Sequence, residues 1–298
     1  MYSKALFLFM MLLALSSCNS REVTAVDVAS QKIDSLIEIQ HVNEHCICIK
    51  FGAESVTAVS TKKGIVIIDA GISSGLTARY RKMIENEFQG DDFAYVIHSH
   101  GHPDHTGGNS IFSGSGIVGH VNCVQEIAGP GSNPEKRIQS LRKIFEQYKS
   151  QLHAVEPDTK EWEDIFSQKT RYGYAYLDAK NSIPILLPDI TFTDSLTLDM
   201  GDLTFEMFYF GKCHSNSDIL VYVRGMKILF TGDLFSKYGR PGIHDTMMTD
   251  KDRWQQAIYW TEKRMMNVDD IIGGHGQMLS IDDLASFHSN ILRICHPE

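Results

Sequence analysis

Four of the chain's thirteen histidines and one aspartate lie within eight residues, in the stretch HSHGHPDH from His98 to His105. The apolar run FAYVI comes directly before this cluster and predicts a strand. Imidazole and carboxylate are the usual ligands of zinc and related divalent metals. A surface tract that binds metals only adventitiously is the alternative interpretation. If the cluster is a site, the fold must let a buried strand deliver metal ligands to a loop at one edge of a sheet.

Short apolar runs before and after the cluster predict two groups of strands. The first group is LIEIQHV, CICIKF, VTAVST and GIVIIDAG; the second, from residue 190, is ITFTDSLTLDM, LTFEMFYF, DILVYV and KILFTGD. Helical spacing of apolar residues follows in SGLTARYRKMIENEF, DRWQQAIYWTEKRM and IDDLASFHSNILRI. This order predicts an α/β domain over residues 33–298, with two β-rich halves that each carry helices on the outer side.

Residues 121–185 interrupt this pattern with long polar helical segments, and we interpret them as a helical insertion. Because the insertion separates the two halves of the candidate site, we expect it to determine substrate choice. Its aromatic residues either line a lid over the site or pack the insertion's own helices: Phe145, Tyr148, Trp162, Phe166, Tyr172, Tyr174 and Tyr176.

The first seventeen residues have the pattern of a secretory signal peptide. Lys4 precedes eleven apolar residues, Ala5–Leu15, which is shorter than the roughly 20 residues that span a bilayer. The stretch LSSC resembles the bacterial lipobox, in which the chain is cut before a cysteine that then carries lipid. We therefore expect an exported protein, lipid-anchored through Cys18 in the periplasm or at the outer membrane of a bacterium, with residues 18–32 as a flexible tether. A plain signal peptide with an incidental cysteine is the alternative.

The charge balance excludes nucleic acid as an expected partner. The chain has 28 basic and 37 acidic residues, a net charge of −9, so a phosphate backbone would be repelled. The expected partner is a small-molecule substrate, and the expected contact with a membrane is the lipid on Cys18.

Three more candidate metal ligands follow strands in the second half of the chain. They are His214 in GKCHSNSD, Asp233 in LFTGDLF and His275 in IIGGHG. Each lies near glycine or another small residue, which allows the backbone to approach a site closely. Together with the cluster they provide enough ligands for two metals.

These motifs resemble those of the metallo-β-lactamase superfamily. The family's H-x-H-x-D-H motif appears as residues 100–105, and the later histidine, aspartate and Gly-His motifs follow in the same order. The resemblance implies an αββα sandwich with a dinuclear site at one edge. It also implies the ligand sets, with one metal held by His100, His102 and His214, the other by Asp104, His105 and His275, and both bridged by Asp233.

The resemblance further places an acidic supporting residue at Asp69, for which an ordinary turn aspartate is the equal alternative. His98 lies outside the motif and either supports a ligand or simply packs.

The implied chemistry is hydrolysis of a carbonyl or phosphoryl ester or amide by a hydroxide that two zinc ions activate, with iron or manganese as alternative metals. Asp104 would orient the water and take its proton. Lys237 and Arg240 are candidates for binding a substrate carboxylate or phosphate.

Three alternatives remain. The first is a β-lactamase, although many β-lactamases of the family have cysteine or a non-ligating serine where this chain has Asp233. The second is an iron-dependent oxidoreductase of the same fold, which the free Cys213 beside His214 keeps open. The third is a metal-binding lipoprotein without catalytic activity.

Overall fold

A computed structural model describes residues 25–131, 133–235, 250–264 and 267–295. The chain divides into two compact units, residues 1–35 and residues 36–298. In the first unit, helix α1 covers Ala25–Ser35, where the sequence predicted a flexible tether. The segment AVDVASQKIDS is polar enough to suggest a tether, but it has no glycine or proline and several good helix formers. The predicted signal peptide and Cys18 lie outside the described residues.

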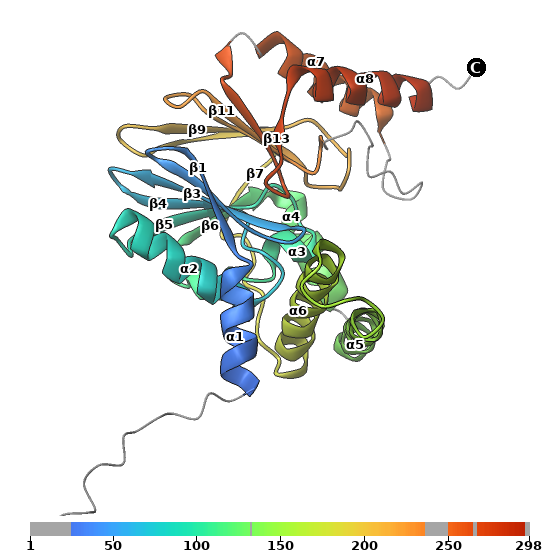
Figure 1. The fold of residues 1–298 in the computed structure, drawn as a ribbon. Helices are drawn as coiled ribbons and strands as arrows, with labels where there is room; N and C mark the ends of the chain where they lie inside the picture. Colours follow the sequence, from blue (N-terminus) through green and yellow to red (C-terminus); the bar gives the residue numbers. More distant parts are fainter. Residues whose placement is uncertain (1–24, 132, 236–249, 265–266, 296–298) are drawn as a thin grey trace, which may run out of the picture. The chain divides into compact units, whose positions relative to one another are not determined.

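Two sheets form the centre of the second unit (Figure 1). In the described part of the chain, the first sheet has seven strands in chain order: β1 (Glu38–Asn43), β2 (Cys46–Phe51), β3 (Glu54–Thr61), β4 (Gly64–Ile68), β5 (Phe93–Ile97), β6 (Gly116–His120) and β7 (Ile190–Phe192). The second has six strands in the order β13-β12-β11-β10-β9-β8: β8 (Ser195–Asp199), β9 (Thr204–Tyr209), β10 (Ile219–Val223), β11 (Ile228–Gly232), β12 (Asp270–Gly273) and β13 (Met278–Leu279). Pairing is antiparallel from β1 to β4 and parallel from β4 to β7, and the β11–β12 pair is also parallel.

The main core lies between the two sheets. It combines Cys46, Cys48 and Val118 of the first sheet with Phe205 and Phe230 of the second. Cys46 and Cys48 are free thiols that pack in this core, because alternate residues of one strand point to the same face of the sheet.

Helices cover the outer faces of both sheets (Figure 1). Helix α2 (Ser74–Phe88) covers the first sheet and buries Leu76, Tyr80 and Ile84. Helices α7 (Lys251–Arg264) and α8 (Ile281–Cys295) cover the second through a second apolar cluster. Strand β10 is buried on both of its faces. Ile219 and Val221 pack in the core between the sheets, while Leu220 and Tyr222 pack in the apolar cluster under α7 and α8. The predicted αββα sandwich is therefore confirmed.

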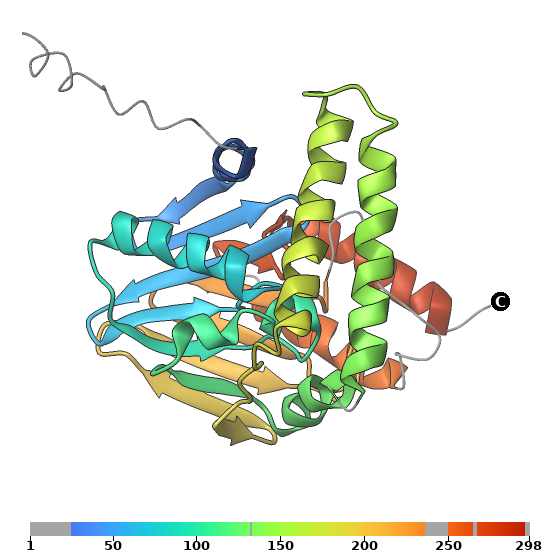
Figure 2. The same cartoon turned by 90° about the horizontal axis from the view of Figure 1, so that it is seen from below.

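The range predicted as a helical insertion contains α4 (Val121–Gly131), α5 (Pro134–Leu152) and α6 (Lys160–Lys180). Helices α5 and α6 lie side by side as a hairpin (Figure 2). Capping side chains begin both, since Asn133 accepts from the backbone N–H of Lys136 and Thr159 from that of Trp162. The aromatic residues mainly stack within the insertion, in the pairs Phe145–Tyr176, Tyr148–Tyr172 and Trp162–Phe166. Among the described residues, no helix combines the length and the apolar character needed to cross a bilayer.

Candidate metal centre

The predicted metal ligands all follow the ends of strands. Strand β5 ends at Ile97, and the loop that follows carries His100 and His102 into the short helix α3 (Pro103–Thr106). His214 lies in the loop between β9 and β10, Asp233 directly follows β11, and His275 follows β12. Because β11 and β12 are parallel neighbours, their ends deliver Asp233 and His275 to the same edge.

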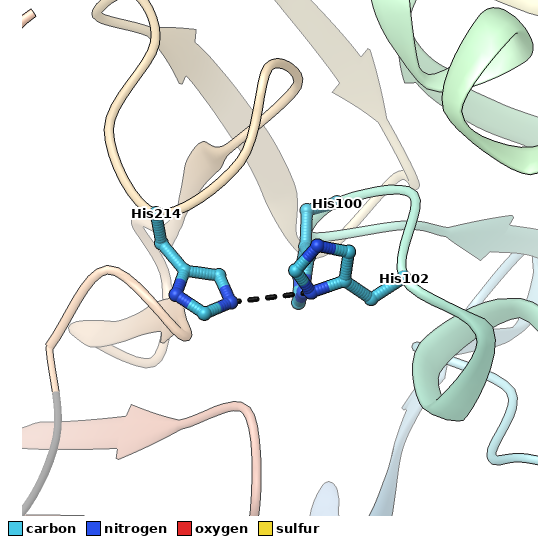
Figure 3. A group of neighbouring side chains, drawn as sticks. All are labelled: His100, His102 and His214. Atoms are coloured by element: carbon cyan, nitrogen blue, oxygen red, sulfur yellow. Dashed lines mark hydrogen bonds between the residues drawn. The ribbon is translucent and has the colours of Figure 1, made fainter. Parts of the chain in front are cut away.

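His100, His102 and His214 form the first group of candidate ligands. One ligand atom from each lies within 4.8 Å of the others. Figure 3 shows the ring of His214 approaching from one loop and the rings of His100 and His102 from another, with His214 Nε2 3.2 Å from His102 Nδ1. The structure thus brings together three imidazoles from two loops that are more than 100 residues apart in the chain.

Asp104, His105 and His275 form the second group, with ligand atoms again within 4.8 Å of one another. Asp233 lies between the two groups. Its Oδ2 atom is 3.2 Å from His275 Nε2, and it is 3.6 Å from both His105 Nε2 and His214 Nε2. Asp233 also forms a candidate ligand group with His100 and His105. A carboxylate in this position contacts ligands of both groups.

Glycine next to the ligands permits this close packing. A Cβ atom on Gly274 would collide with the carboxylate of Asp233 and the ring of His105. Gly232 has a φ of +52°, in the left-handed region that favours glycine, immediately before Asp233.

The unpaired nitrogens of the cluster fit a metal. Nε2 of His100 is buried and makes no hydrogen bond within the described residues. Nε2 of His105 is also buried, and the oxygens of Asp233 and Asp104 lie 3.6 and 4.0 Å from it. Such atoms normally have a partner, because burying a polar group without one is costly. Burial also lowers the pKa of His100 and of His102, so both imidazoles stay neutral with a free lone pair. These residue types and orphaned nitrogens suit zinc or a similar divalent ion.

The two carboxylates supply negative charge to the site. Burial alone would raise the pKa of Asp233, but His105 and His275 outweigh it and hold that pKa well below its ordinary value. Burial likewise opposes ionisation of Asp104, but His105, His275 and Arg171 together lower its pKa. Both groups are therefore ionised at neutral pH and can accept a cation or a proton.

Asp69 has the supporting position expected for it. Its Oδ2 atom is 2.8 Å from His105 Nδ1 and accepts a hydrogen bond from Ser99 Oγ, while Oδ1 accepts from the backbone N–H of Ser99. This contact orients His105 so that Nε2 faces the site. Asp69 is buried and its carboxylate is bonded to Ser99 and His105, so it supports the candidate site in addition to occupying the turn after β4, where its φ is +59°.

His98 is fully buried, and Nδ1 lies 4.0 Å from Asp69 Oδ1. Burial lowers its pKa to about 4, despite the opposing effect of Asp69. His98 belongs to none of the candidate ligand groups. Its ring interacts with Asp69, Asn109 and the backbone of His105, so it packs beneath the candidate site.

Cys213 lies away from the site. Its side chain is buried in the apolar cluster under α7, with Trp254 and Leu220, and burial raises the pKa of its thiol. The proximity of Cys213 to His214 in the sequence therefore does not make it a ligand. Lys237 and Arg240, predicted as substrate contacts, lie outside the described residues.

A buried ionic network that the sequence did not indicate supports Asp104. Arg171 of α6 lies 3.3 Å from Glu54 Oε2 through Nε and 3.7 Å from Asp104 Oδ2 through Nη2. Glu54 also accepts hydrogen bonds from Tyr80 Oη and from the backbone N–H of Ile72. No local pattern marks these residues, because they come together only in the fold.

A second support holds the loop that carries His214. Asp218 accepts hydrogen bonds from the backbone N–H and the hydroxyl of Ser215. Glu126 of α4 accepts from the hydroxyl of Ser217 and from the backbone N–H of Gly101, which links the loop of His214 to the loop of His100 and His102. The spacing of Ser215 and Asp218 is typical of a local side-chain turn and could have been recognised in the sequence, whereas Glu126 gave no such signal.

Comparison with known proteins agrees with this geometry. Residues 49–275 match the family model of the metallo-beta-lactamase superfamily. The chain is 21% identical over 266 residues to metallo-beta-lactamase type 2 of Bacillus sp. (strain 170), covering 84% of this chain and 83% of the relative. It is 22% identical over 232 residues to metallo-beta-lactamase type 2 of Bacillus cereus, and the match covers 76% of this chain and 70% of the relative.

Solved structures show the same fold. A metallo-beta-lactamase from Pontibacter korlensis aligns with a TM-score of 0.56 and 20% identity, over 86% of this chain and 99% of that one. The metallo-beta-lactamase FIM-1 from Pseudomonas aeruginosa aligns with a TM-score of 0.59 and 13% identity, over 88% of this chain and 97% of that one. With the family model spanning both groups of candidate ligands, the chain belongs to the metallo-beta-lactamase superfamily.

Proposed function

We propose that this protein is a dinuclear zinc hydrolase that cleaves a carbonyl or phosphoryl ester or amide bond in a small molecule. The observation that carries the proposal is the position of Asp233, whose Oδ2 lies within 3.6 Å of histidines from both ligand groups. His100, His102 and His214 would hold one metal, and Asp104, His105 and His275 the other. The name of the FIM-1 structure, which describes a mono-zinc form, supports zinc as the metal of this fold.

The residues of the chain provide the remaining parts of the reaction. Bound metals would supply positive charge that polarises the bond under attack and lowers the pKa of a nearby water. Asp104 is ionised, is about one-third exposed, and lies beside His105 and His275, the other candidate ligands of its group. Its carboxylate can therefore orient that water and accept its proton. Arg171 contacts the same carboxylate and limits its movement.

Opening of a β-lactam ring is the second candidate function. It is favoured by the names of the relatives, which are metallo-beta-lactamases of type 2. Asp233 argues against it, because the family resemblance implies cysteine or a non-ligating serine at this position in many β-lactamases. An ester, thioester, lactone or phosphodiester is therefore the preferred substrate class.

The test is a panel of substrates with zinc-loaded protein from residue 19 onward: a chromogenic cephalosporin, a 4-nitrophenyl ester, a δ-lactone, a thioester and bis(4-nitrophenyl) phosphate. The proposal predicts turnover of at least one, loss of turnover with a chelator, and a loss of about 100-fold or more in Asp104→Asn. Asp92→Asn, on the exposed surface, is the matched control. Opening of the cephalosporin alone would establish the second candidate, and no turnover of any substrate would contradict both.

A further inference from the structure

A cavity of about 600 Å³ borders the candidate metal centre. Pro103 and Asp104, from the segment that carries candidate ligands, line it. Residues of helices α5 and α6 also line it, so the insertion and the candidate site share one hollow. The volume is in the range of pockets that bind small molecules, about 300–1,000 Å³.

One wall of the cavity is apolar. Leu141 and Ile144 of α5 face it together with Tyr172 and Ala175 of α6. Tyr172 is held in place by stacking on Tyr148, with ring centroids 5.7 Å apart. Of the insertion's aromatic residues considered as a lid, Tyr172 is the one that borders this cavity. An apolar part of a ligand would be buried here.

The same cavity also carries positive charge, although the chain as a whole is acidic. Arg137 and Lys136 occupy the first turns of α5 and border the hollow. The N-terminal end of α5 adds the partial positive charge of a helix terminus. An anion in this position would meet two side-chain cations from one helix.

The side chain of Arg137 is available to bind a ligand. Its guanidinium is half-buried and makes no hydrogen bond or ion pair with any residue that the structure describes. The nearest carboxylate that influences it, Asp178, is already bonded to the backbone N–H and the hydroxyl of Ser74. Arg171, by contrast, is occupied by Glu54 and Asp104. Arg137, which lines the cavity, therefore has donors available for a ligand.

We propose that this cavity is the substrate pocket and that Arg137 binds an anionic group of the substrate. The inference rests on the proposed function, which places the scissile bond at Asp104. The substrate would then be a small amphiphilic organic anion: its hydrolysed group at the metal centre, its apolar part against Ile144 and Tyr172, and a carboxylate at the guanidinium of Arg137. On hydrolysis, water oxygen bonds to the acyl or phosphoryl centre, the bond to the leaving group breaks, and the leaving atom takes a proton.

Equilibrium binding tests the pocket independently of turnover. Isothermal titration calorimetry of the zinc-loaded protein would compare 4-phenylbutanoate with 4-phenylbutanol, which have the same apolar part. The proposal predicts that the carboxylate binds at least tenfold more tightly than the alcohol, since Arg–carboxylate pairs are charge-assisted and bidentate. Arg137→Met removes that preference and Arg137→Lys restores part of it. Arg142→Met, which removes an exposed cation from the same helix, retains the wild-type preference.

The outcomes separate the pocket from the metal centre. A carboxylate preference that persists in Arg137→Met would show that the anion binds elsewhere, for example at the metals, and would overturn the inference. Equal binding of the two probes, or no binding of either, would also overturn it. Metal content is measured on the same samples: loss of zinc in the wild type would contradict the proposed function, whereas normal zinc with no effect of Arg137 would contradict only the pocket.

Discussion

Arg171 of the insertion lies 3.7 Å from Asp104 and 3.3 Å from Glu54, so one guanidinium joins the candidate catalytic loop to strand β3. Its side chain is almost completely buried, at 4% exposure, and that of Glu54 is fully buried. Breaking one partner of such a pair leaves an uncompensated buried charge. The insertion is therefore tied to the site through a contact that is sensitive to substitution.

We predict that Arg171→Met lowers the free energy of unfolding by about 3–5 kcal/mol, because Glu54 is left buried without its cation. Adding Glu54→Gln to Arg171→Met should recover part of the loss. Urea denaturation measures both variants, with Lys180→Met, an exposed cation on the same helix, as the control. A loss below about 1 kcal/mol, as for an exposed ion pair, would contradict this account.

Substitution of Asp69 should lower the zinc affinity of the second group of candidate ligands more than that of the first. We predict that Asp69→Asn weakens zinc binding to Asp104, His105 and His275 by about 10- to 100-fold, because the carboxylate that orients His105 is lost. Asparagine tolerates the left-handed backbone at this position, so the fold should be retained. Competition with a chelator measures the weaker of the two zinc affinities, and circular dichroism checks the fold. Equal zinc affinities in Asp69→Asn and wild type would show that the contact with His105 is irrelevant.

Asp218 should make stability depend on pH. Burial raises its pKa from 3.8 to about 7, despite hydrogen bonds from Ser215 that favour the charged form. The folded state then binds the proton more tightly than the unfolded state, so the contribution of Asp218 to stability is fully present below about pH 4 and is lost as the pH rises towards 7. The loss is on the order of a few kcal/mol.

The measurement is urea denaturation of the metal-free protein between pH 4.5 and 7.5. Asp218→Asn should give a flatter dependence of the unfolding free energy on pH than the wild type, while Asp91→Asn, at an exposed position, should not. Parallel curves for Asp218→Asn and wild type would mean that Asp218 titrates normally.

We propose that the protein is exported and anchored through lipid on Cys18. Expressed from residue 1 in a bacterium with lipoprotein processing, the wild type should fractionate with the membranes and Cys18→Ala should become soluble after export or remain uncleaved. Cys123→Ala, at a buried position, is the matched cysteine control and should stay in the membrane fraction. Wild-type protein in the soluble fraction would favour the plain signal peptide.

The candidate ligands nearest in the sequence are also the easiest to predict. His100, His102 and His105 belong to one loop after one strand, so their proximity needs no knowledge of the fold. His214, Asp233 and His275 could be suggested because each follows a strand, but the grouping came from the family resemblance. Strand β6 was missed because its five residues include two glycines, which weaken the strand pattern.

The supporting residues could not be predicted from local patterns. Glu54 and Arg171 are 117 residues apart and meet only through the packing of the insertion on the first sheet. Arg171 lies in a polar helix, where an arginine is expected to face solvent. Arg137 also lies in a polar helix, and its half-buried position beside the cavity distinguishes it from the exposed cations of α5.

The central claim is that two separate ligand groups hold two metals, and the most direct test is the number of zinc ions per chain. Inductively coupled plasma mass spectrometry of zinc-loaded, dialysed protein should give two zinc ions per chain for the wild type. It should give one zinc ion per chain for His102→Ala and one for His275→Ala, because each substitution removes a ligand from only one group. Both variants should keep the circular dichroism spectrum of the wild type. One zinc ion in the wild type, or two in both variants, would contradict the dinuclear site.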